Sequence, residues 1–355
     1  MKAHISVEMS QKIRNMSLAC ACLVVSIHVI WPHEQPLSIG WFMHEAVSQG
    51  IAELAVPFFF IVSGFFLAQH FDDDCWYQCE VKKRVKSLLV PFICWSVIAC
   101  MASASLGIIA DFLAHRPLGT NVVLLRSDNW LRLFGFDLTK YPLLGTLWYV
   151  RCLMLFVLTS FVFKYVVRKF GLFWLMVSFV FVLLYDHIPN ENWREFFRMG
   201  YSASGIFYFS IGVFLQKIFS VHPHLWNDTS GTSWLVVVSG LVGVTLLAIR
   251  LACAYNSWRF YLVAGKMSLP FLIYFVWHLT PSVKIPKWFT DCSFPIFLMH
   301  GIALGYVSLC MKKCAITGLA NAFIHYFVGI VLPIVITLLL RRLAPKAAGF
   351  LFGGR

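Results

Sequence analysis

Charged side chains are scarce in this sequence. Of its 355 residues, 13% are Asp, Glu, Lys or Arg and 59% are hydrophobic, whereas charged residues make up about 25% of a typical soluble domain. No stretch long enough for a separate soluble domain is left once the apolar runs are counted. The composition therefore excludes an ordinary soluble protein and predicts a polytopic membrane protein.

Three further features are missing. The first fifteen residues are polar and no small-residue cleavage site follows the apolar run from Leu18, so we expect the first helix to be retained. Eleven cysteines are present, but Cys20-x-Cys22 and Cys75-x₃-Cys79 lack His or Cys partners at zinc-like spacing, and we expect no metal site. No internal repeat is visible, which disfavours a repeat-built transporter.

Acidic residues are fewer than basic ones, and the formal net charge is +13. Membrane-edge placement of the lysines and arginines explains this excess better than a nucleic-acid partner does. With the N-terminus inside, seventeen Lys and Arg fall on the cytoplasmic side and ten on the outer side. We therefore expect a multi-pass membrane protein, surrounded by membrane lipids, with cytoplasmic tails at 1–15 and 341–355.

The apolar runs predict an all-α single bundle of about ten transmembrane helices within residues 16–340, because about twenty apolar residues cross a bilayer as a helix. The approximate spans are 16–31, 51–70, 88–110, 145–164, 172–186, 202–219, 234–251, 262–281, 293–311 and 321–340.

The stretch 51–91 organises the rest of the chain. Its apolar run contains Ser63-Gly64, a small polar pair that a purely lipid-facing helix has no reason to keep. An acidic turn follows, and then a cationic cluster at the mouth of the next helix, made of Lys82, Lys83, Arg84 and Lys86. A dense positive patch at one membrane edge favours an anionic, phosphate-bearing ligand. Ordinary positive-inside charge is the alternative.

Ionisable groups inside hydrocarbon are costly, so each is a functional candidate. His28 lies roughly 20 Å along the first helix from Arg14, at 1.5 Å per residue. A neutral imidazole there is suited to act as a general base toward a hydroxyl that enters from outside. A structural His bonded to a neighbouring carbonyl is an equally good interpretation.

Two more charged residues accompany His28. Glu53 begins the second span from the outer side, where it either orients the imidazole or holds a sugar hydroxyl, or is a plain interfacial carboxylate. Arg151 lies early in the fourth span, where it could stabilise an oxyanion or a phosphate, or snorkel to the interface. His300 is a candidate for helix packing or for the substrate path, and the pair Trp148-Tyr149 is a candidate for the substrate path.

The ordered set of these residues resembles the acyltransferase-3 family of integral membrane acyltransferases. The matching motifs cover about residues 12–340 and read Leu23-Val24-Val25-x-x-His28, Val56-Pro57-Phe58-Phe59-Phe60-Ile61-Val62-Ser63-Gly64, Lys83-Arg84-Val85-Lys86-x-Leu88-Leu89-x-Pro91, Leu147-Trp148-Tyr149-x-Arg151, Phe209-x-x-Gly212 and Ile296-Phe297-Leu298-Met299-His300.

The resemblance implies transfer of an acyl group, usually acetyl, from cytoplasmic acyl-CoA (acetyl-CoA) to a hydroxyl of a sugar, polysaccharide or lipid-linked saccharide. It makes His28 the catalytic histidine and assigns the cations at 83–86 to the donor. Ser63-Gly64 would then let backbone and pantetheine approach closely, since glycine has no side chain to clash.

The sequence departs from the family at two positions. Many members carry an arginine eleven residues before the histidine, where this chain has Ser17, and a second basic residue where it has Ser87. Either Arg14, one turn nearer the cytoplasm, or Arg151 would then replace the missing arginine. A saccharide or lipid-intermediate flippase without chemistry is the alternative function, and a degenerate member that acts as a sensor or scaffold is a third.

Overall fold

The structure is a computed structural model that describes residues 6–120, 122, 130–221, 233–256, 258 and 260–354. Helices dominate this part of the chain, and no β-strand occurs in it. The prediction of an all-α membrane protein is therefore confirmed.

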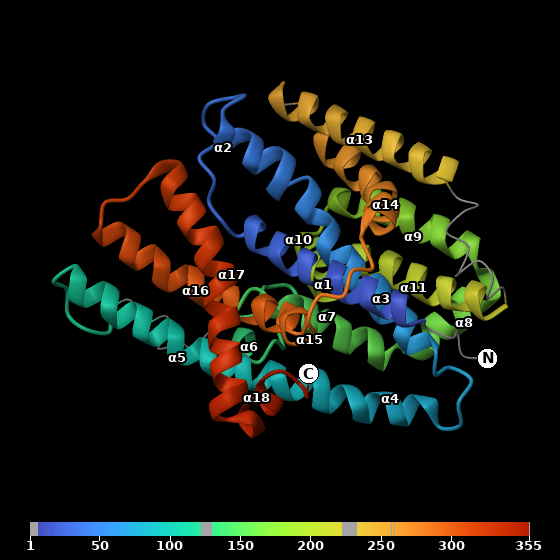
Figure 1. Cartoon of the computed structure of the whole chain (residues 1–355), viewed down its shortest axis with the longest axis horizontal. Helices are drawn as coiled ribbons and strands as arrows, with labels where there is room; N and C mark the ends of the chain where they lie inside the picture. Colours follow the sequence, from blue (N-terminus) through green and yellow to red (C-terminus); the bar gives the residue numbers. More distant parts are fainter. Residues whose placement is uncertain are drawn as a thin grey trace.

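Long helices alternate with short turns (Figure 1). The α-helices are α1 (Val7–Ile27), α2 (Ile39–Phe42), α3 (Ala55–Ala68), α4 (Trp76–Arg84), α5 (Val90–Leu113), α6 (Trp130–Leu133), α7 (Leu147–Leu158), α8 (Ser160–Phe170), α9 (Leu172–Leu184), α10 (Glu191–Glu195), α11 (Ala203–Val221), α13 (Ser233–Tyr255), α14 (Tyr261–Leu279), α15 (Lys287–Thr290), α16 (Ser293–Lys313), α17 (Gly318–Leu343) and α18 (Pro345–Leu351). Short π or 3₁₀ turns join some of them at Met43–Ser48, Ile51–Leu54, Val85–Leu89, Tyr185–His187 and Phe196–Gly200.

Seven of the described helical segments are long and apolar enough to cross a membrane, or eight if the bent pair α7–α8 is one span. The seven are Ile39–Ala68, Trp76–Leu113, Glu191–Val221, Trp234–Tyr255, Tyr261–Leu279, Ser293–Lys313 and Gly318–Leu343. The predicted number of about ten is therefore too high by this criterion.

Two predicted spans account for most of the difference. The first, at 16–31, falls on α1, which ends at Ile27 and whose first half carries the buried polar residues Gln11 and Asn15. The fifth, at 172–186, falls on α9, which has 13 residues and is therefore about 20 Å long, short of the ~30 Å hydrocarbon core.

The centre of the bundle is the contact between α3 and α11, which lie together with α1 and α7 in Figure 1. A Cβ atom on Gly64 would come within 2.2 Å of the Phe209 carbonyl oxygen, and one on Gly212 within 2.0 Å of the Ile61 oxygen. Small residues let two membrane helices approach backbone to backbone. The two glycines thus set the spacing of the central helix pair.

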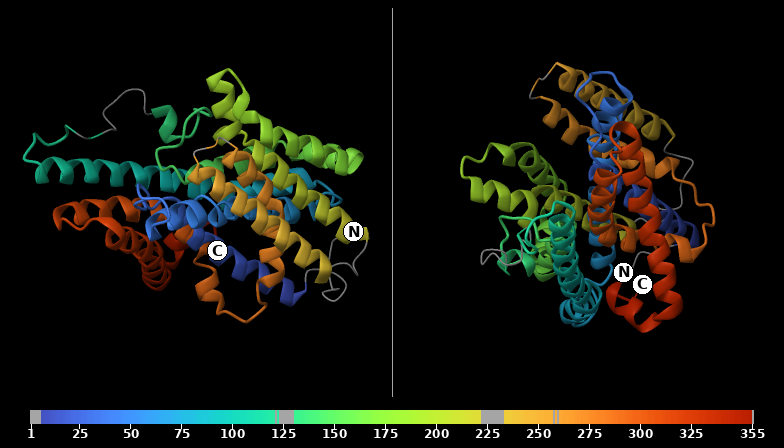
Figure 2. Two further views of the ribbon diagram at one scale, coloured as in Figure 1. Left: turned by 90° about the horizontal axis from the view of Figure 1, so that it is seen from above. Right: turned by 90° about the vertical axis from the view of Figure 1, so that its left-hand side faces the viewer.

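Two helix pairs flank this centre. The pair α16–α17 packs beside α5 on one side, and the pair α13–α14 lies on another (Figures 1 and 2). Residues Val25 and Val29, at the end of α1, share an apolar cluster with Ile296 and Leu304 of α16. This contact brings the end of the first helix to the middle of α16.

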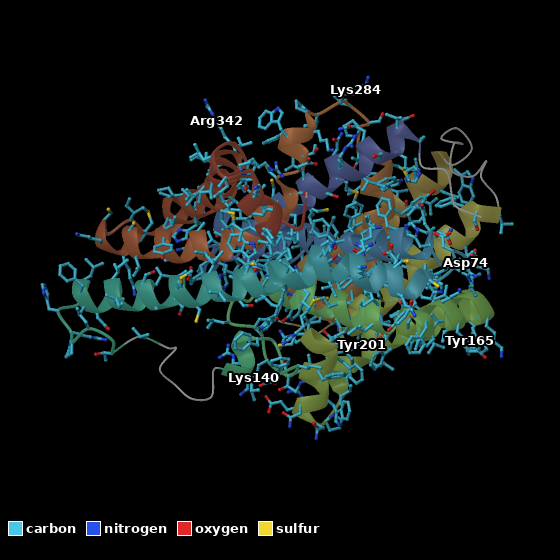
Figure 3. The ribbon with its side chains drawn as sticks, turned by 90° about the horizontal axis from the view of Figure 1, so that it is seen from below. Asp74, Lys140, Tyr165, Tyr201, Lys284 and Arg342 are labelled. Atoms are coloured by element: carbon cyan, nitrogen blue, oxygen red, sulfur yellow. The ribbon has the colours of Figure 1, made fainter. Side chains whose placement is uncertain are left out.

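Segments predicted to share one side of the membrane do meet. Arg168 of α8 pairs with Asp72 of the turn after α3 at 2.7 Å, and Lys217 donates to the Arg168 carbonyl at 3.0 Å. Figure 3 accordingly shows Asp74 and Tyr165 at the same end of the molecule. At the other end, buried Arg250 pairs with Glu45 at 3.2 Å.

The residues predicted as a C-terminal tail are helical and packed. After α17 the chain forms α18 against α5, where Trp95 donates to the Leu351 carbonyl at 2.9 Å and its ring stacks on fully buried Phe352. Gly353 has a positive φ of 67°, and a Cβ there would lie 2.5 Å from the Ser87 oxygen. Glycine is therefore required on both counts. Of the predicted N-terminal tail, residues 1–5 lie outside the described part, and α1 begins at Val7.

Candidate active site

His28 caps the C-terminal end of α1. Its backbone N–H donates to the Val25 carbonyl at 3.1 Å, while the Ser26 carbonyl accepts from the Ser48 hydroxyl at 2.7 Å and the Trp31 indole at 3.1 Å. These contacts fix the backbone at the helix end. The imidazole itself is exposed and makes no hydrogen bond with any described residue. It is thus held in place by its backbone and open to a reactant.

His300 of α16 is the partner that the structure places beside it. The two ring centroids are 5.0 Å apart with the planes at 41°. His300 is fully buried, and its Nδ1 lies 2.9 Å from the Ile296 carbonyl oxygen. Its Nε2 is buried without a hydrogen-bond partner. The sequence offered both histidines as candidates but not their proximity.

A chain of contacts continues from the histidine pair to α3 and α7. The Phe297 ring lies 6.3 Å from that of His300 and 5.5 Å from that of Tyr149. The Tyr149 hydroxyl is 3.2 Å from Ser63 Oγ, so these two predicted residues are hydrogen-bonded. Trp148, by contrast, packs on Phe60 at 6.5 Å in the apolar core.

Gly64 has a different role from the one that the family resemblance implies. The space beside its Cα is filled by the α11 backbone, as described above. The close approach that this glycine permits is made by a neighbouring helix, and a pantetheine chain cannot occupy the same space. We therefore correct the expectation for Gly64, while Ser63 remains at the interior face of α3.

Arg151 of α7 lies away from solvent, with 3% exposure, and its guanidinium is held by backbone carbonyls. Nη1 donates to the carbonyls of Gly135 (3.3 Å) and Asp137 (2.7 Å), and Nη2 to those of Lys140 (3.0 Å) and Met199 (3.1 Å). Among the described residues the guanidinium makes no ion pair with a carboxylate, and these four carbonyls take up its hydrogen-bond donors instead. It ties the loop at 135–140 into the bundle.

Glu53 lies in the turn before α3 and is exposed. Arg250 and Arg198 are close enough to interact electrostatically with its carboxylate, but no hydrogen bond or ion pair links it to His28 in the described part of the chain. Arg14 is remote from His28, at about 21 Å for fourteen residues of helix, and Nη2 of Arg14 donates to Gln11. No hydrogen bond or ion pair among the described residues joins any two of His28, Glu53 and Arg14.

A polar network near Glu53 escaped the sequence reasoning. Buried Arg250 of α13 donates to the Glu45 carbonyl at 2.6 Å and pairs with its carboxylate. Glu45 also contacts His44 Nδ1 at 3.0 Å, and the His44 ring stacks on His33 with centroids 4.2 Å apart. The available signal was Arg250 itself, an arginine at the end of the apolar run 234–251.

The cationic cluster lies on one continuous helical segment, with three members in the last turn of α4 and Lys86 in the π turn at Val85–Leu89. Buried Glu80, which the sequence reasoning missed, pairs with Lys83 at 3.2 Å and Arg84 at 3.3 Å. Lys82 and Lys86 are exposed and have no acidic partner among the described residues. These two lysines therefore carry the free charge of the cluster.

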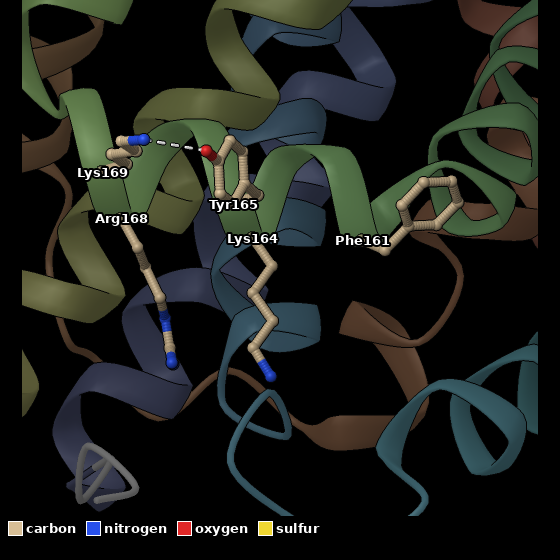
Figure 4. A pocket seen from close by; sticks show the side chains of 5 residues that line it. All are labelled: Phe161, Lys164, Tyr165, Arg168 and Lys169. Atoms are coloured by element: carbon tan, nitrogen blue, oxygen red, sulfur yellow. Dashed lines mark hydrogen bonds between the residues drawn. The ribbon is translucent and has the colours of Figure 1, made fainter.

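Two clefts lie near α4. An apolar cleft of about 440 Å³ runs between α4–α5 and α7 and includes Arg84 and Arg151 among its lining residues. The other, of about 410 Å³, lies on α8 and is lined by Phe161, Lys164, Tyr165, Arg168 and Lys169 (Figure 4). Its cations are already engaged, because Lys164 donates to the Phe71 carbonyl, Arg168 to Asp72 and Lys169 to the Tyr165 hydroxyl. Neither cleft is lined by His28.

Outside the spans, the hydrogen bond from Arg168 holds the pKa of Asp72 below its usual value. Among the residues that the structure covers, no three His, Cys, Asp or Glu side chains converge as a metal site would require.

The fold and site define a helical membrane protein with a pair of histidine rings between the end of α1 and α16 and with two exposed lysines, Lys82 and Lys86, that have no acidic partner among the described residues. Residues 18–342 match the acyltransferase-3 family, described as an acyltransferase domain. This match covers nearly the whole chain, so the protein belongs to that family and is assigned to the acyltransferases.

A curated relative is similar to this chain over most of its length but has another activity in its name. An amino-acid racemase of Enterococcus faecalis is 23% identical over 344 residues, which is 92% of this chain and 45% of the relative. The chain thus spans less than half the length of that protein. No solved structure matches the chain.

Proposed function

We propose that the protein is a membrane O-acyltransferase that moves an acyl group, acetyl in the simplest case, from acyl-CoA to a hydroxyl of a sugar, polysaccharide or lipid-linked saccharide. The observation that carries this proposal is the imidazole of His28, which is exposed, unpartnered and fixed at the end of α1 inside an acyltransferase-family bundle. Such a group is free to accept a proton from an alcohol.

The reaction needs one bond made and one broken. The acceptor oxygen attacks the thioester carbonyl carbon while His28 takes its proton. The carbon–sulfur bond then breaks, and His28 returns the proton to the departing sulfur of CoA. A thioester is reactive enough for this exchange to proceed with a well-placed base.

The donor end of the proposal rests on the cationic cluster. Lys82 and Lys86 are exposed and unpaired, so they can bind the phosphates of CoA at the edge of the bundle. We assign this edge to the cytoplasm and the protein to the bacterial inner membrane, because acyl-CoA is a cytoplasmic metabolite and the positive-inside rule favours the same orientation.

The experiment uses purified protein in nanodiscs, acetyl-CoA labelled in its acetyl group and a panel of polysaccharides and lipid-linked saccharides. Wild-type protein should label at least one acceptor, and His28→Ala should reduce the rate by about 10²–10⁴-fold, the usual contribution of a general base. The matched control is His278→Ala, which removes an imidazole from α14 that makes its hydrogen bond and its ring contact with Tyr274.

Equal rates for His28→Ala and wild type would overturn the mechanism. Movement of an unmodified saccharide across the membrane in the absence of acyl-CoA, unaffected by His28→Ala, would replace it with the flippase alternative. Label retained on His28 would show that the histidine carries the acyl group itself rather than acting as a base.

A further inference from the structure

Three histidines of this protein share one local arrangement, in which Nδ1 contacts the carbonyl four residues earlier on the same helix. The distances are 2.9 Å for His278, 2.9 Å for His300 and 2.8 Å for His325. A carbonyl oxygen only accepts hydrogen bonds, so Nδ1 carries the proton in each case. In a neutral imidazole Nε2 is then left with a lone pair and must accept.

His300 differs from the other two in what its Nε2 meets. The Nε2 of His325 lies 2.9 Å from the Ser308 hydroxyl, which can donate to it. The Nε2 of His300 has no partner among the described residues, although the residue has 0% exposure. A buried acceptor that has lost its water and gained no donor is unfavourable, so a donor is expected to reach it.

The ring of His28 is placed to supply that donor. A ring nitrogen lies about 1 Å from its centroid, so rings 5.0 Å apart can bring facing nitrogens to about 3 Å, a hydrogen-bonding distance. The exposed His28 side chain is held by no other hydrogen bond in the described structure, so a rotation about its side-chain bonds suffices. His300, in contrast, is fixed by the Ile296 carbonyl.

We propose that His300 Nε2 accepts a hydrogen bond from one N–H of His28 and so sets the tautomer and direction of the catalytic imidazole. The other nitrogen of His28 then keeps its lone pair and faces the acceptor hydroxyl. His300 acts through His28 and is a positioning residue, and this inference rests on the proposed function. The group that orients the base is a neutral imidazole on another helix.

One other donor competes for the same atom. The Thr146 hydroxyl oxygen is buried without a partner, and Thr146 lies beside α16, since a Cβ on Gly301 would be 3.6 Å from its methyl carbon. A bond from Thr146 to His300 would satisfy both groups and leave His28 unguided. The test therefore includes a variant of each residue.

The variants are His300→Leu, which removes the acceptor, His300→Gln, whose amide oxygen can replace it, and Thr146→Val. The control is His325→Leu, which removes a histidine of the same local geometry. Labelled acetyl-CoA is the probe, kcat and KM are measured, and ¹⁵N NMR of histidine-labelled protein reports the tautomer of His28.

We expect His300→Leu to lower kcat about 10–100-fold, the usual effect of losing a group that orients a ligating or catalytic imidazole, with KM for acetyl-CoA within twofold. His300→Gln should recover most of kcat. The His28 ¹⁵N signals should change from a single tautomer to a mixture in the leucine variant only, and Thr146→Val and His325→Leu should resemble wild type.

An unchanged kcat in His300→Leu would overturn the inference. A lower kcat in His300→Leu with an unchanged His28 tautomer would also overturn it. The same holds if Thr146→Val lowers kcat as much as His300→Leu does. If His28→Ala abolishes transfer while His300→Leu does not, only this inference fails. If His28→Ala is fully active, the proposed function fails first.

Discussion

Arg151 either holds the loop at 135–140 in place or takes part in the reaction. The four carbonyls around its guanidinium allow these two roles to be tested separately. If Arg151 holds the loop at 135–140, then Arg151→Met removes the donors and leaves these oxygens without partners. The contacts to Gly135 and Met199 are fully buried, and each unsatisfied buried group costs roughly 1–3 kcal/mol. The substitution also removes the free-energy cost of burying the guanidinium charge, which offsets part of this loss. The free energy of unfolding should therefore fall by about 2–4 kcal/mol.

A lysine variant of Arg151 separates the effect of the positive charge from that of the hydrogen bonds. Arg151→Lys keeps the positive charge but replaces the planar guanidinium with a single ammonium, which cannot reach four carbonyls in a forked arrangement. It should therefore be destabilised nearly as much as Arg151→Met. The control is Arg342→Met, which removes an exposed arginine at the end of α17 and should change stability by less than about 0.5 kcal/mol.

The assay is unfolding of the purified protein in mixed micelles, read by loss of helical circular dichroism, beside the acetyl-transfer rate of the folded fraction. Destabilised variants with near-normal activity per folded molecule would identify a structural residue. An Arg151→Met variant as stable as wild type but at least a hundredfold slower, with partial recovery in Arg151→Lys, would refute the reasoning and return Arg151 to the reaction centre.

Three other predictions follow from the fold. Gly64→Ala should destabilise the protein by about 1–3 kcal/mol through overpacking, because its Cβ would lie 2.2 Å from a backbone oxygen of α11; Gly349→Ala, where nothing lies within 4 Å, is the control in the same unfolding assay. Exchanging Lys82 and Lys86 for glutamate should raise KM for acetyl-CoA at least tenfold with little change in kcat, and high salt should raise the wild-type KM toward the same value; an unchanged KM would move the donor site elsewhere. Arg168 of α8 lowers the pKa of Asp72 in the folded protein. The Asp72 carboxylate therefore stabilises the fold at pH values above the usual Asp pKa of about 4, and this stabilisation is lost as the pH falls through the lowered pKa of the folded state. Melting curves of wild type and Asp72→Asn should accordingly differ at pH 7 and converge in acid.

The helical class and the candidate histidines could be predicted because they depend on local sequence. Apolar runs fix helices, and an imidazole such as His28 or His300 stands out in a hydrocarbon segment. The number of spans was overestimated because hydrophobicity alone does not separate a crossing helix from a short one such as α9 or a partly polar one such as α1.

Contacts between helices could not be predicted in this way. His28 and His300 lie far apart in the chain, and only the packing of α1 on α16 brings them together. The same holds for Arg151, whose carbonyl partners lie in the loop at 135–140 and at Met199. It holds also for Glu80, which is buried and pairs with Lys83 and Arg84. A glycine such as Gly64 signals close approach in the sequence, but not the identity of the group that approaches.

The docking of α18 has a practical consequence for anyone who extends or labels this polypeptide. Gly353 rests on Ser87, one residue from Lys86, so the last turn of the described chain lies beside the segment that carries this unpaired lysine. A bulky or acidic group attached to the last helix would therefore compete with an anionic donor for the Lys86 charge, and affinity handles are better attached at the opposite terminus.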